Sequence, residues 1–356
     1  MAKILIHVQH LLGSGHAHRM AALAAALAQA GHDTTLASGG QPLALELGAA
    51  KLEQLPSLRA ADARFKDLRD AHDRPIDEAW RRMRATATLE LFSRIKPDLL
   101  IVELYPFGRS MLAFELEALL AQAVSIPVLG SVRDVLQRPA DDQKAAKRID
   151  AARRYAAILV HGDRDFLSLE TSWPETAALA DRLVYTGYVA PQARASASTR
   201  DEIVVSVGGG AAGATLLRMA LACAAKRASA DERWRIRVGN KAATATCENP
   251  FVVVEANRPD FADLLRRARL SISQAGYNTC VDLLRARCKA ILVPFAEASE
   301  REQTIRAAAF ARHGLAHVLG ANETLDAAIG AVREPASLDI ACEGASVAAK
   351  LVGQWL

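Results

Sequence analysis

The chain has 356 residues, of which 51% are hydrophobic and 24% are charged, and its formal net charge is +4. That length exceeds what one ordinary compact core accommodates and favours two domains of moderate size. The basic residues are scattered rather than clustered, which argues against nucleic acid as a partner, whereas a slight positive charge suits an anionic small molecule.

Short apolar runs alternate with Ala- and Leu-rich stretches through the first half of the chain, which is typical of βαβ units and parallel sheets. The first strand leads through a Gly-containing turn into a helix that is expected to end near Gln29, before Gly31. The charged stretch 62–84 is expected to be a surface excursion or a loosely packed helix. The runs predicted to be strands are residues 4–8, 34–37, 99–102, 128–131 and 158–160.

Residues 190–200 contain Pro, Ser and Ala without hydrophobic periodicity and are interpreted as a linker. The pattern then restarts, and each new strand precedes a helix-like segment. These observations divide the chain into a first domain at 1–189, a second at 201–335, and a terminal segment at 336–356 that ends in an amphipathic stretch. The strands predicted in the second domain are residues 203–207, 235–238, 251–254, 270–273 and 290–294.

The five cysteines are odd in number and show no CxxC spacing, which indicates buried, reduced thiols rather than a disulfide framework or a metal site. The apolar run at the N-terminus is too short for a signal peptide, and no stretch is long enough to span a bilayer. We therefore expect a cytoplasmic protein without a bound metal.

Three loops of the second domain share one design, in which a buried strand is followed by a turn of small residues and the start of a helix. In a parallel sheet such loops meet at the carboxyl edge, where open α/β folds bind their ligands. Free backbone N–H groups and the positive end of a helix dipole suit a diphosphate.

The first of these loops contains Gly208, Gly209 and Gly210. Without Cβ atoms the backbone can approach a phosphate closely, and three successive glycines exceed what a tight turn alone requires. The loop also matches GxGxxG, the fingerprint of NAD-dependent dehydrogenases, but the next strand ends at Asn240 and Lys241 rather than at the acid that holds the ribose. It lacks the Gly-Lys-Ser/Thr ending of a P-loop. A diphosphate-binding turn is therefore preferred to a dinucleotide site.

The second loop places Gly276 before a predicted helix that contains Asp282 near its start. Gly276 permits close approach of a phosphate, and Asn278 or Thr279 could cap the helix and contact it. Asp282 could accept hydrogen bonds from ribose hydroxyls, although stabilisation of the helix dipole explains an acid there equally well.

The third loop leads to Glu302 and Gln303 at the start of a further helix. Their side chains could hydrogen-bond sugar hydroxyls, with Arg301 or Arg306 near the phosphates. A charged, solvated helix start is the simpler explanation for this loop taken by itself.

In the first domain, His16 follows the first strand in a glycine-containing loop at a helix N-terminus. The helix dipole disfavours the protonated imidazole, so His16 is a candidate general base, and a bond to the loop backbone is the alternative. His7 and His10 are interpreted as structural, and His18 and Arg19 as surface or packing residues.

Two further strand ends in this domain carry an acid and an arginine. Glu103 ends a strand shortly before Arg109, and Arg133 precedes Asp134 after the next strand. Glu103 and Asp134 are rival candidates for the general base. An internal Arg–carboxylate ion pair is the competing explanation for each.

Residues 273–282 and the later Glu302 and Gln303 resemble the donor-binding signature of MurG, the peptidoglycan N-acetylglucosaminyltransferase, and its relatives. More closely, the chain is similar to a group of bacterial glycosyltransferases related to that enzyme. The likeness extends over segments from nearly the whole chain, namely residues 9–16, 103–109, 131–134, 160–163, 186–188, 275–279 and 302–307.

The resemblance implies the GT-B fold, an α/β architecture of two Rossmann-like domains with parallel sheets that face across a cleft, and a C-terminal helix that returns to the first domain. It implies an inverting, metal-independent transfer from a nucleoside-diphosphate sugar, commonly a UDP-sugar, without a cofactor. By position, Gly209, Gly210, Gly276, Asn278 and Thr279 would bind the diphosphate, Asp282 the ribose and Gln303 the donor sugar, with His16 in the acceptor-side loop.

The implied partners are the nucleotide-sugar donor and a small or lipid-linked acceptor, and a lipid-linked acceptor would bring peripheral contact with a membrane. MurG-type enzymes carry an arginine and a glutamate where this chain has Gln274 and Asp282, and their acceptor loop is richer in glycine. The identity of the acceptor therefore does not carry over.

Two other functions stay open. A nucleotide-sugar hydrolase would use the same cleft with water in place of the acceptor, as in hydrolases with a similar Gly-x-Gly-His loop. A non-catalytic nucleotide-sugar sensor would bind the donor alone. A dry, unoccupied acceptor cleft favours these two functions, whereas a broad groove with an apolar rim favours transfer.

Overall fold

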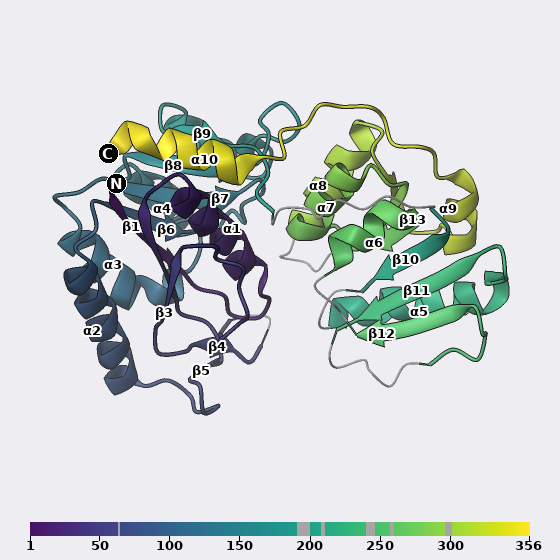
Figure 1. Cartoon of the computed structure of the whole chain (residues 1–356), viewed down its shortest axis with the longest axis horizontal. Coiled ribbons are helices and arrows are strands. Elements are labelled where there is room, and N and C mark those ends of the chain that lie inside the picture. The colour runs from purple at the N-terminus through teal and green to yellow at the C-terminus, as the bar shows by residue number, and fades with distance from the viewer. Residues whose placement is uncertain (63–64, 191–199, 208–210, 240–245, 257–259, 296–300) are drawn as a thin grey trace. The chain divides into compact units, whose positions relative to one another are not determined.

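The computed structural model describes residues 1–62, 65–190, 200–207, 211–239, 246–256, 260–295 and 301–356 (Figure 1). The chain forms two compact units. The first comprises Met1–Pro191 and Ala341–Leu356, and the second comprises Gln192–Ile340.

The first unit is built on a parallel sheet whose strands are β1 (Lys3–Val8), β2 (Asp33–Ser38), β3 (Lys51–Gln54), β6 (Leu99–Glu103), β7 (Val128–Arg133), β8 (Ala157–His161) and β9 (Leu183–Tyr185). Their order across the sheet is β3-β2-β1-β6-β7-β8-β9. β6 is buried along its whole length, as expected of a strand that is covered on both faces. The short strands β4 (Arg59–Ala60) and β5 (Leu68–Arg69) form a separate antiparallel pair.

The helices of the first unit pack on both faces of this sheet (Figure 1). They are α1 (Gly15–Gln29), α2 (Glu78–Ile95), α3 (Ala113–Gln122), α4 (Asp142–Ala152) and α10 (Gly344–Val352), with the 3-10 helices η1 (Ser110–Leu112), η2 (Leu169–Thr171), η3 (Pro174–Leu179) and η5 (Gly353–Trp355). Side chains alternate along a strand, so Ile4 and Ile6 of β1 pack with α1 and α10, whereas Leu5 packs with α2 and α3.

The chain leaves the first unit after Pro191 and returns to it at Ala341. The segments before the exit and after the return are hydrogen-bonded to each other. Tyr188 N donates to Ala341 O at 2.7 Å, and Gly344 N donates to Tyr188 O at 3.0 Å. Gly187 has a φ of +84°, and a Cβ there would lie 2.8 Å from Ala341 O, so this close approach requires glycine. α10 follows directly and packs against α1.

The second unit is built on a parallel sheet of β10 (Glu202–Ser206), β11 (Arg233–Val238), β12 (Val252–Ala256), β13 (Ala268–Ser273), β14 (Ala290–Leu292) and β15 (His317–Val318). The order is β12-β11-β10-β13-β14-β15. Ile236, Val205, Ile272 and Ile291 are neighbours across four of these strands and form a row of the aliphatic core. The helices are α5 (Ala211–Arg227), α6 (Phe261–Arg267), α7 (Tyr277–Ala286), α8 (Glu302–Arg312) and α9 (Leu325–Ala331).

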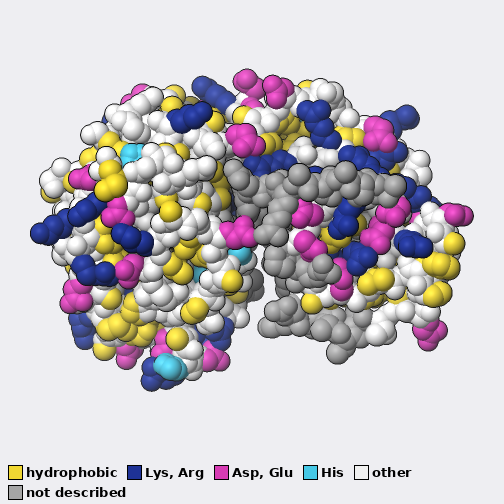
Figure 2. All heavy atoms as spheres, viewed as in Figure 1, with side chains coloured by type: hydrophobic (Ala, Val, Ile, Leu, Met, Phe, Trp, Pro, Cys, Tyr) yellow, Lys and Arg dark blue, Asp and Glu magenta, His cyan; other side chains and the backbone are white. Residues whose placement is uncertain are grey.

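The surface carries charges of both signs. On the face that Figure 2 displays, Lys and Arg side chains are interspersed with Asp and Glu. None of the helices in the described parts of the chain is long and apolar enough to cross a membrane.

The predicted fold class is confirmed: two α/β domains with parallel sheets, and a C-terminal helix packed on the first. Residues 62–84 were predicted to be a surface excursion or a loosely packed helix, and most of those that the structure describes are exposed or partly exposed. They contain β5 and the first part of α2, and Arg84 within α2 is completely buried because Glu115 neutralises its charge. A helix was also expected after every strand of the second domain, but the described residues between β11 and β12 form none.

The cysteines differ in burial from the expectation. Cys280 and Cys288 are buried, but Cys223, Cys247 and Cys342 are partly exposed. Two of the partly exposed thiols, Cys223 and Cys247, pack at the margin of the second unit's core rather than within it. All five are free thiols.

Candidate functional site

The connectivity of the first unit's sheet reverses beside β1, which has β2 on one side and β6 on the other. Open α/β sheets bind ligands outside the carboxyl ends of their strands at such a point. At that edge, β1 continues into the loop that leads to His16, and β6 ends at Glu103. The topology thus explains how two residues 87 positions apart come together.

His16, Glu103 and Arg19 form one hydrogen-bonded cluster. Nδ1 of His16 lies 2.6 Å from Oε1 of Glu103, and Nη2 of Arg19 donates to the same oxygen at 2.5 Å. His16 is the second residue of α1, and Arg19, three positions later, lies on the same helix face. The Glu103 side chain is completely buried, whereas that of His16 is 16% exposed. The imidazole therefore remains accessible to a ligand.

The electrostatics of this cluster keep His16 neutral. Burial lowers the pKa of His16 to about 3, with Glu103 opposing the shift and Arg109 adding to it. Burial disfavours ionisation of Glu103, but His16, Arg19 and Arg109 outweigh it, so the pKa of Glu103 lies below its ordinary value.

The protonation states fix the tautomer of His16. An ionised carboxylate only accepts hydrogen bonds, so the 2.6 Å contact requires the imidazole proton on Nδ1. The 3.3 Å approach of Arg19 to Nδ1 is longer and does not alter this assignment. Nε2 then keeps its lone pair, and it makes no hydrogen bond within the part of the chain that the structure describes. This arrangement is that of a general base oriented by a carboxylate.

The backbone that follows Glu103 is held in an unusual conformation. Leu104 has a φ of 66° and Arg109 a φ of 58°, a region that residues other than glycine seldom adopt. Leu104 N donates to Ser131 O and Gly108 N donates to Leu104 O, both at 2.8 Å. Strained backbone of this kind is typical of functional sites, where surrounding contacts over-determine it. Here it fixes the position of the last residue of β6, which is Glu103.

Asp134, the other carboxylate considered as a base, is completely buried and accepts a hydrogen bond from the Tyr188 hydroxyl at 3.3 Å. His161, at the end of β8, is buried between Ser131 Oγ and Thr186 Oγ1, each 2.9 Å from a ring nitrogen. Burial lowers the pKa of His161 to about 3. Both side chains make internal contacts at the ends of β7 and β8. Neither side chain is exposed, whereas that of His16 is partly exposed.

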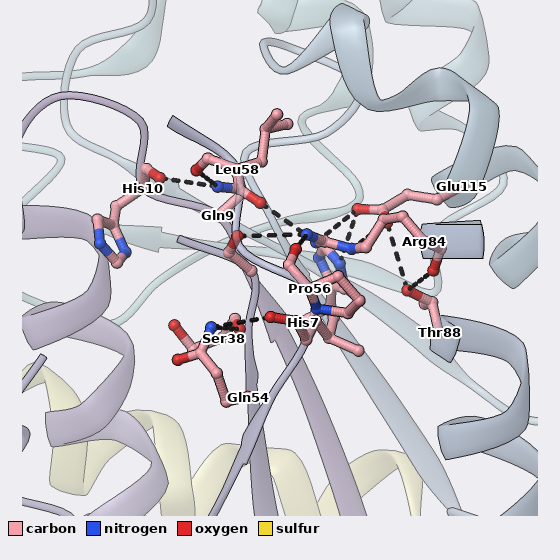
Figure 3. Close-up of polar contacts among 12 residues, drawn as sticks. His7, Gln9, His10, Ser38, Gln54, Pro56, Leu58, Arg84, Thr88 and Glu115 are labelled. Atoms are coloured by element: carbon pink, nitrogen blue, oxygen red, sulfur yellow. Dashed lines mark hydrogen bonds and ion pairs between the residues drawn. The ribbon is translucent and has the colours of Figure 1, made fainter. Parts of the chain in front are cut away.

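A second buried polar cluster supports the loop that leads from β1 toward His16 (Figure 3). Arg84 Nε lies 2.7 Å from Glu115, and His7 Nε2 lies 3.2 Å from the same carboxylate. Arg84 also donates to Gln9 Oε1 and to Gly39 O, each at 3.2 Å. The cluster therefore connects α2 and α3 with the ends of β1 and β2.

Gln9 extends this cluster to a third segment. Its Nε2 donates to Leu58 O at 2.9 Å and to His10 O at 2.8 Å. A Cβ on Gly39 would overlap the side chains of Gln9 and Arg84, so the approach of these two side chains requires glycine. The expectation that His7 is structural agrees with its contact to Glu115.

Two of these residues were missed or misassigned from the sequence. Arg19, expected at the surface or in packing, is 2% exposed and paired with Glu103. Its spacing of three from His16 is a signal that would have placed it on the same helix face. Arg84 lies in the charged stretch that was read as irregular, and its partner Glu115 is 31 positions away, so no local signal connects them.

The structure describes only part of the three donor loops that were predicted in the second unit. Gly208, Gly209 and Gly210 follow β10 and lie outside the described residues. β13 is the neighbour of β10 on the far side from β11, so the connectivity reverses here as it does beside β1. The second predicted loop leaves β13 at this position.

α7 begins at Tyr277 with Gly276 as its N-cap residue in an extended conformation. A Cβ built on Gly276 meets no atom within 4 Å, so the space before the helix is open. The prediction that Asn278 or Thr279 caps the helix is wrong, because the helix starts before them. Both are partly exposed residues of its first turn, where free N–H groups suit an anion.

Asp282 is the sixth residue of α7, beyond its first turn. Stabilisation of the helix dipole, which acts within the first turn, therefore does not explain this acid. Burial raises the pKa of Asp282 to about 7, with Arg285 and Arg266 opposing the shift. A carboxyl group in that range both donates and accepts hydrogen bonds, which suits hydroxyl groups. The described residues include no group of three His, Cys, Asp or Glu side chains that could hold a metal ion.

Arg306 connects the second and third predicted loops. Its side chain is completely buried, and it donates to Ala275 O at 2.7 Å and to Glu302 Oε1 at 2.9 Å. Gln303, beside Glu302, accepts a hydrogen bond from Phe295 N at 3.1 Å through Oε1. Residues 296–300 of the third loop lie outside the described residues.

Residues 204–338 match the glycosyltransferase family 28 C-terminal domain. The search of curated proteins found no match.

Three solved structures illustrate the structural likeness. The glycosyltransferase of kitacinnamycin has a TM-score of 0.64 at 17% identity, covering 100% of this chain and 99% of that one. The spinosyn rhamnosyltransferase SpnG complexed with thymidine diphosphate has a TM-score of 0.59 at 17% identity, covering 99% and 95%. MurG of Acinetobacter baumannii has a TM-score of 0.57 at 15% identity, covering 98% and 95%.

These results confirm the resemblance that the sequence motifs indicated. The structural likenesses extend over the whole chain and establish its fold, and the domain match covers nearly all of the second unit. The chain has the GT-B fold of these glycosyltransferases, and most of its second unit matches the glycosyltransferase family 28 C-terminal domain.

Proposed function

We propose that the enzyme transfers a sugar, with inversion, from a nucleoside-diphosphate sugar to an acceptor hydroxyl. The observation that carries this proposal is the His16–Glu103 pair, in which a neutral, partly exposed imidazole is oriented by a buried carboxylate. The pair lies at the edge of the sheet where α/β folds bind ligands.

In the proposed reaction, Nε2 of His16 accepts the proton of the acceptor hydroxyl while the oxygen attacks the anomeric carbon. The bond between that carbon and the diphosphate oxygen breaks, and its electron pair leaves with the nucleoside diphosphate. Glu103 stabilises the imidazolium that forms, and Arg19 holds the carboxylate in place. A single displacement of this kind inverts the anomeric configuration.

The second unit would hold the donor. The open position at Gly276 and the N–H groups of the first turn of α7 suit the diphosphate and its developing charge. Asp282 would bind the ribose and Gln303 the sugar. The likeness to SpnG, whose structure contains thymidine diphosphate, supports a nucleoside diphosphate as the leaving group. The MurG resemblance favours uridine as its base.

Ligand-induced stabilisation tests the donor class. UDP, dTDP, GDP, CMP and NAD are added separately, and the unfolding transition is measured. A nucleoside diphosphate at a hundred times its dissociation constant stabilises the fold by about 2.7 kcal/mol. We expect UDP to give the largest shift and EDTA to leave both binding and transfer unchanged, because backbone amides stabilise the leaving group. Stabilisation by NAD alone would contradict the proposal.

A further inference from the structure

The loop of residues 9–14 leads from β1 to the start of α1, where His16 is the second residue, and its two halves are held differently. In the first half, residues 9–11 are buried. In the second half, Leu12 is 55% exposed, and a Cβ on Gly13 would meet no atom within 4 Å. Ser14, the N-cap residue of α1, makes no capping hydrogen bond with its side chain. The second half is thus exposed and uncapped, so its course depends on how the first half is held.

Gln9 fixes the first half of this loop. Its Nε2 donates to His10 O at 2.8 Å and to Leu58 O at 2.9 Å, and its Oε1 accepts a hydrogen bond from Nη2 of Arg84 at 3.2 Å. A carboxamide has two N–H donors and one acceptor oxygen, so all of its hydrogen-bonding functions are used here. Gln9 is only 1% exposed and has no surface for a ligand. Any effect that it has on the chemistry must therefore pass through the loop.

Arg84 provides the fixed point to which Gln9 is bound. Its side chain is completely buried, its Nε lies 2.7 Å from Oε2 of Glu115, and its Nη1 donates to Gly39 O at 3.2 Å. Figure 3 shows the guanidinium of Arg84 between Gln9 and Glu115. Replacement of a whole buried ion pair by apolar residues is often neutral for stability, and a defined arrangement is then what the pair contributes. Here that arrangement holds the carboxamide of Gln9 in one place.

We propose that Gln9 is a positioning residue for the transfer: bound to Arg84, it sets the course of residues 12–14 and so the access of the acceptor hydroxyl to Nε2 of His16. The inference rests on the proposed function, in which His16 takes the proton of that hydroxyl. Misplacement of reacting groups by about 1 Å can slow a reaction about 10²-fold, so the loop beside the base needs one defined arrangement.

Acylation of His16 by diethyl pyrocarbonate tests this arrangement without an acceptor. The lone pair of a neutral imidazole attacks the reagent, and tandem mass spectrometry locates the product on His16. Gln9→Met keeps the length of the side chain and removes its hydrogen bonds. We expect His16 to be acylated about 2- to 10-fold faster in this variant, because the loss of a hydrogen bond makes local opening of the loop easier. His72, which is exposed, gives the reference rate in the same sample.

Two further variants separate positioning from a general loss of stability. Gly39→Ala places a Cβ where it would overlap the side chains of Gln9 and Arg84, so it disturbs the same contact from outside the loop and should also speed acylation. Thr88→Val removes two hydrogen bonds of the same cluster but none of those made by Gln9, and it should leave the rate at His16 unchanged. All variants are compared at a temperature where circular dichroism shows them folded.

Turnover gives the functional measurement. With a productive acceptor, we expect kcat/KM of Gln9→Met to fall about 10- to 100-fold, the cost of a displaced reacting group. The affinity for UDP, or for whichever nucleoside diphosphate binds, should stay unchanged, because the predicted donor loops belong to the second unit. A merely structural role of Gln9 would lower the unfolding temperature without this difference between acceptor turnover and donor binding.

The outcomes separate this inference from the proposed function. A wild-type rate of acylation at His16 in both Gln9→Met and Gly39→Ala overturns the inference, as does an equal acceleration in Thr88→Val. Faster acylation with wild-type turnover in Gln9→Met also overturns it, because the loop would then move without consequence for the transfer. Near-normal turnover in His16→Ala contradicts the proposed function instead, and faster acylation in Gln9→Met would then still support control of the loop by Gln9.

Discussion

Glu103 links His16 and Arg19 in the first unit. It accepts hydrogen bonds from His16 and Arg19 through a single oxygen, and its charge also acts on Arg109. The sequence offered Glu103 and Asp134 as alternatives to His16. The structure suggests a different relation, because Glu103 is bonded to His16 rather than competing with it, and Asp134 is bonded to Tyr188.

Replacing Glu103 by Gln tests that relation. The amide has the same shape but cannot stabilise an imidazolium, so turnover should fall roughly 10²–10⁴-fold, the usual contribution of acid–base catalysis. The substitution also ends the buried ion pair between Glu103 and Arg19, which makes the variant less stable by up to about 3–5 kcal/mol. Turnover is measured as nucleoside-diphosphate release at a temperature where circular dichroism shows the variant folded.

The Asp134→Asn variant is the comparison for Glu103→Gln. The substitution removes a buried carboxylate of the same unit that has no role in the proposed proton transfer to His16. We expect it to lower stability but to retain more turnover than Glu103→Gln. The reverse ranking of turnover would transfer the role to Asp134.

At the scale of elements, the strand–turn–helix units were predictable because each depends on local pattern. The apolar runs and the glycine that ends α1 are signals within a few residues of each other. The start of α7 was predicted too late in the chain. Gly276 is its N-cap residue in an extended conformation, and the neighbouring residues carry no pattern that predicts this. Contacts such as Arg84 with Glu115 join two helices and have no local signal.

Gly276→Val tests the diphosphate loop. The backbone of Gly276 has φ −67° and ψ 149°, which valine adopts readily, and its Cβ would meet nothing within 4 Å. The fold should therefore be unaffected, while the added methyl groups block the first turn of α7. We expect at least a tenfold loss of UDP affinity by calorimetry, equivalent to about 1.4 kcal/mol.

A second open glycine of the same unit provides the control for Gly276→Val. Gly330 in α9 also has no atom within 4 Å of a Cβ position, so Gly330→Val should leave UDP affinity unchanged. Wild-type affinity in Gly276→Val would move the diphosphate away from α7. The equivalent test at Gly210 concerns a residue outside the described parts of the chain.

For the whole molecule, the alternation of strands and helices was enough to predict two α/β domains, and the motifs were enough to indicate a glycosyltransferase. The distribution of buried charge was not predictable in this way. Arg19, Arg84 and Glu115 are buried because the sheet brings their partners from distant positions. Some histidines are buried as well, and because burial disfavours the protonated imidazole, the stability of the fold should depend on pH.

Stability should fall as pH decreases from 6.5 to 4.5. His16 and His161 have folded pKa values of about 3, below the unfolded value of 6.5, so the unfolded state binds more protons in this window. Each contributes a slope of up to about 1.4 kcal/mol per pH unit. Asp282, whose pKa is raised to about 7, gives one slope of the opposite sign in this window, so the two histidines still outweigh it. The lowered pKa values of Glu103 and Glu115 act in the same direction, but only below about 4.5.

Chemical unfolding at pH 6.5, 5.5 and 4.5 measures this slope. His161→Gln removes one of the two groups and should make the dependence shallower by up to about 1.4 kcal/mol per pH unit. His72, which is exposed, provides the control, and His72→Gln should leave the slope unchanged. A slope in His161→Gln equal to that of the wild type would show that His161 protonates in the folded state.

The most direct test of the central claim is turnover and nucleotide affinity in His16→Ala, measured on the same preparation. Removing a general base slows proton transfer without touching the donor loops, which belong to the second unit. We expect nucleoside-diphosphate release with a productive acceptor to fall roughly 10²–10⁴-fold while UDP affinity stays within twofold of the wild type. Near-normal turnover in His16→Ala would contradict the account, and so would a loss of UDP binding that matches the loss of turnover.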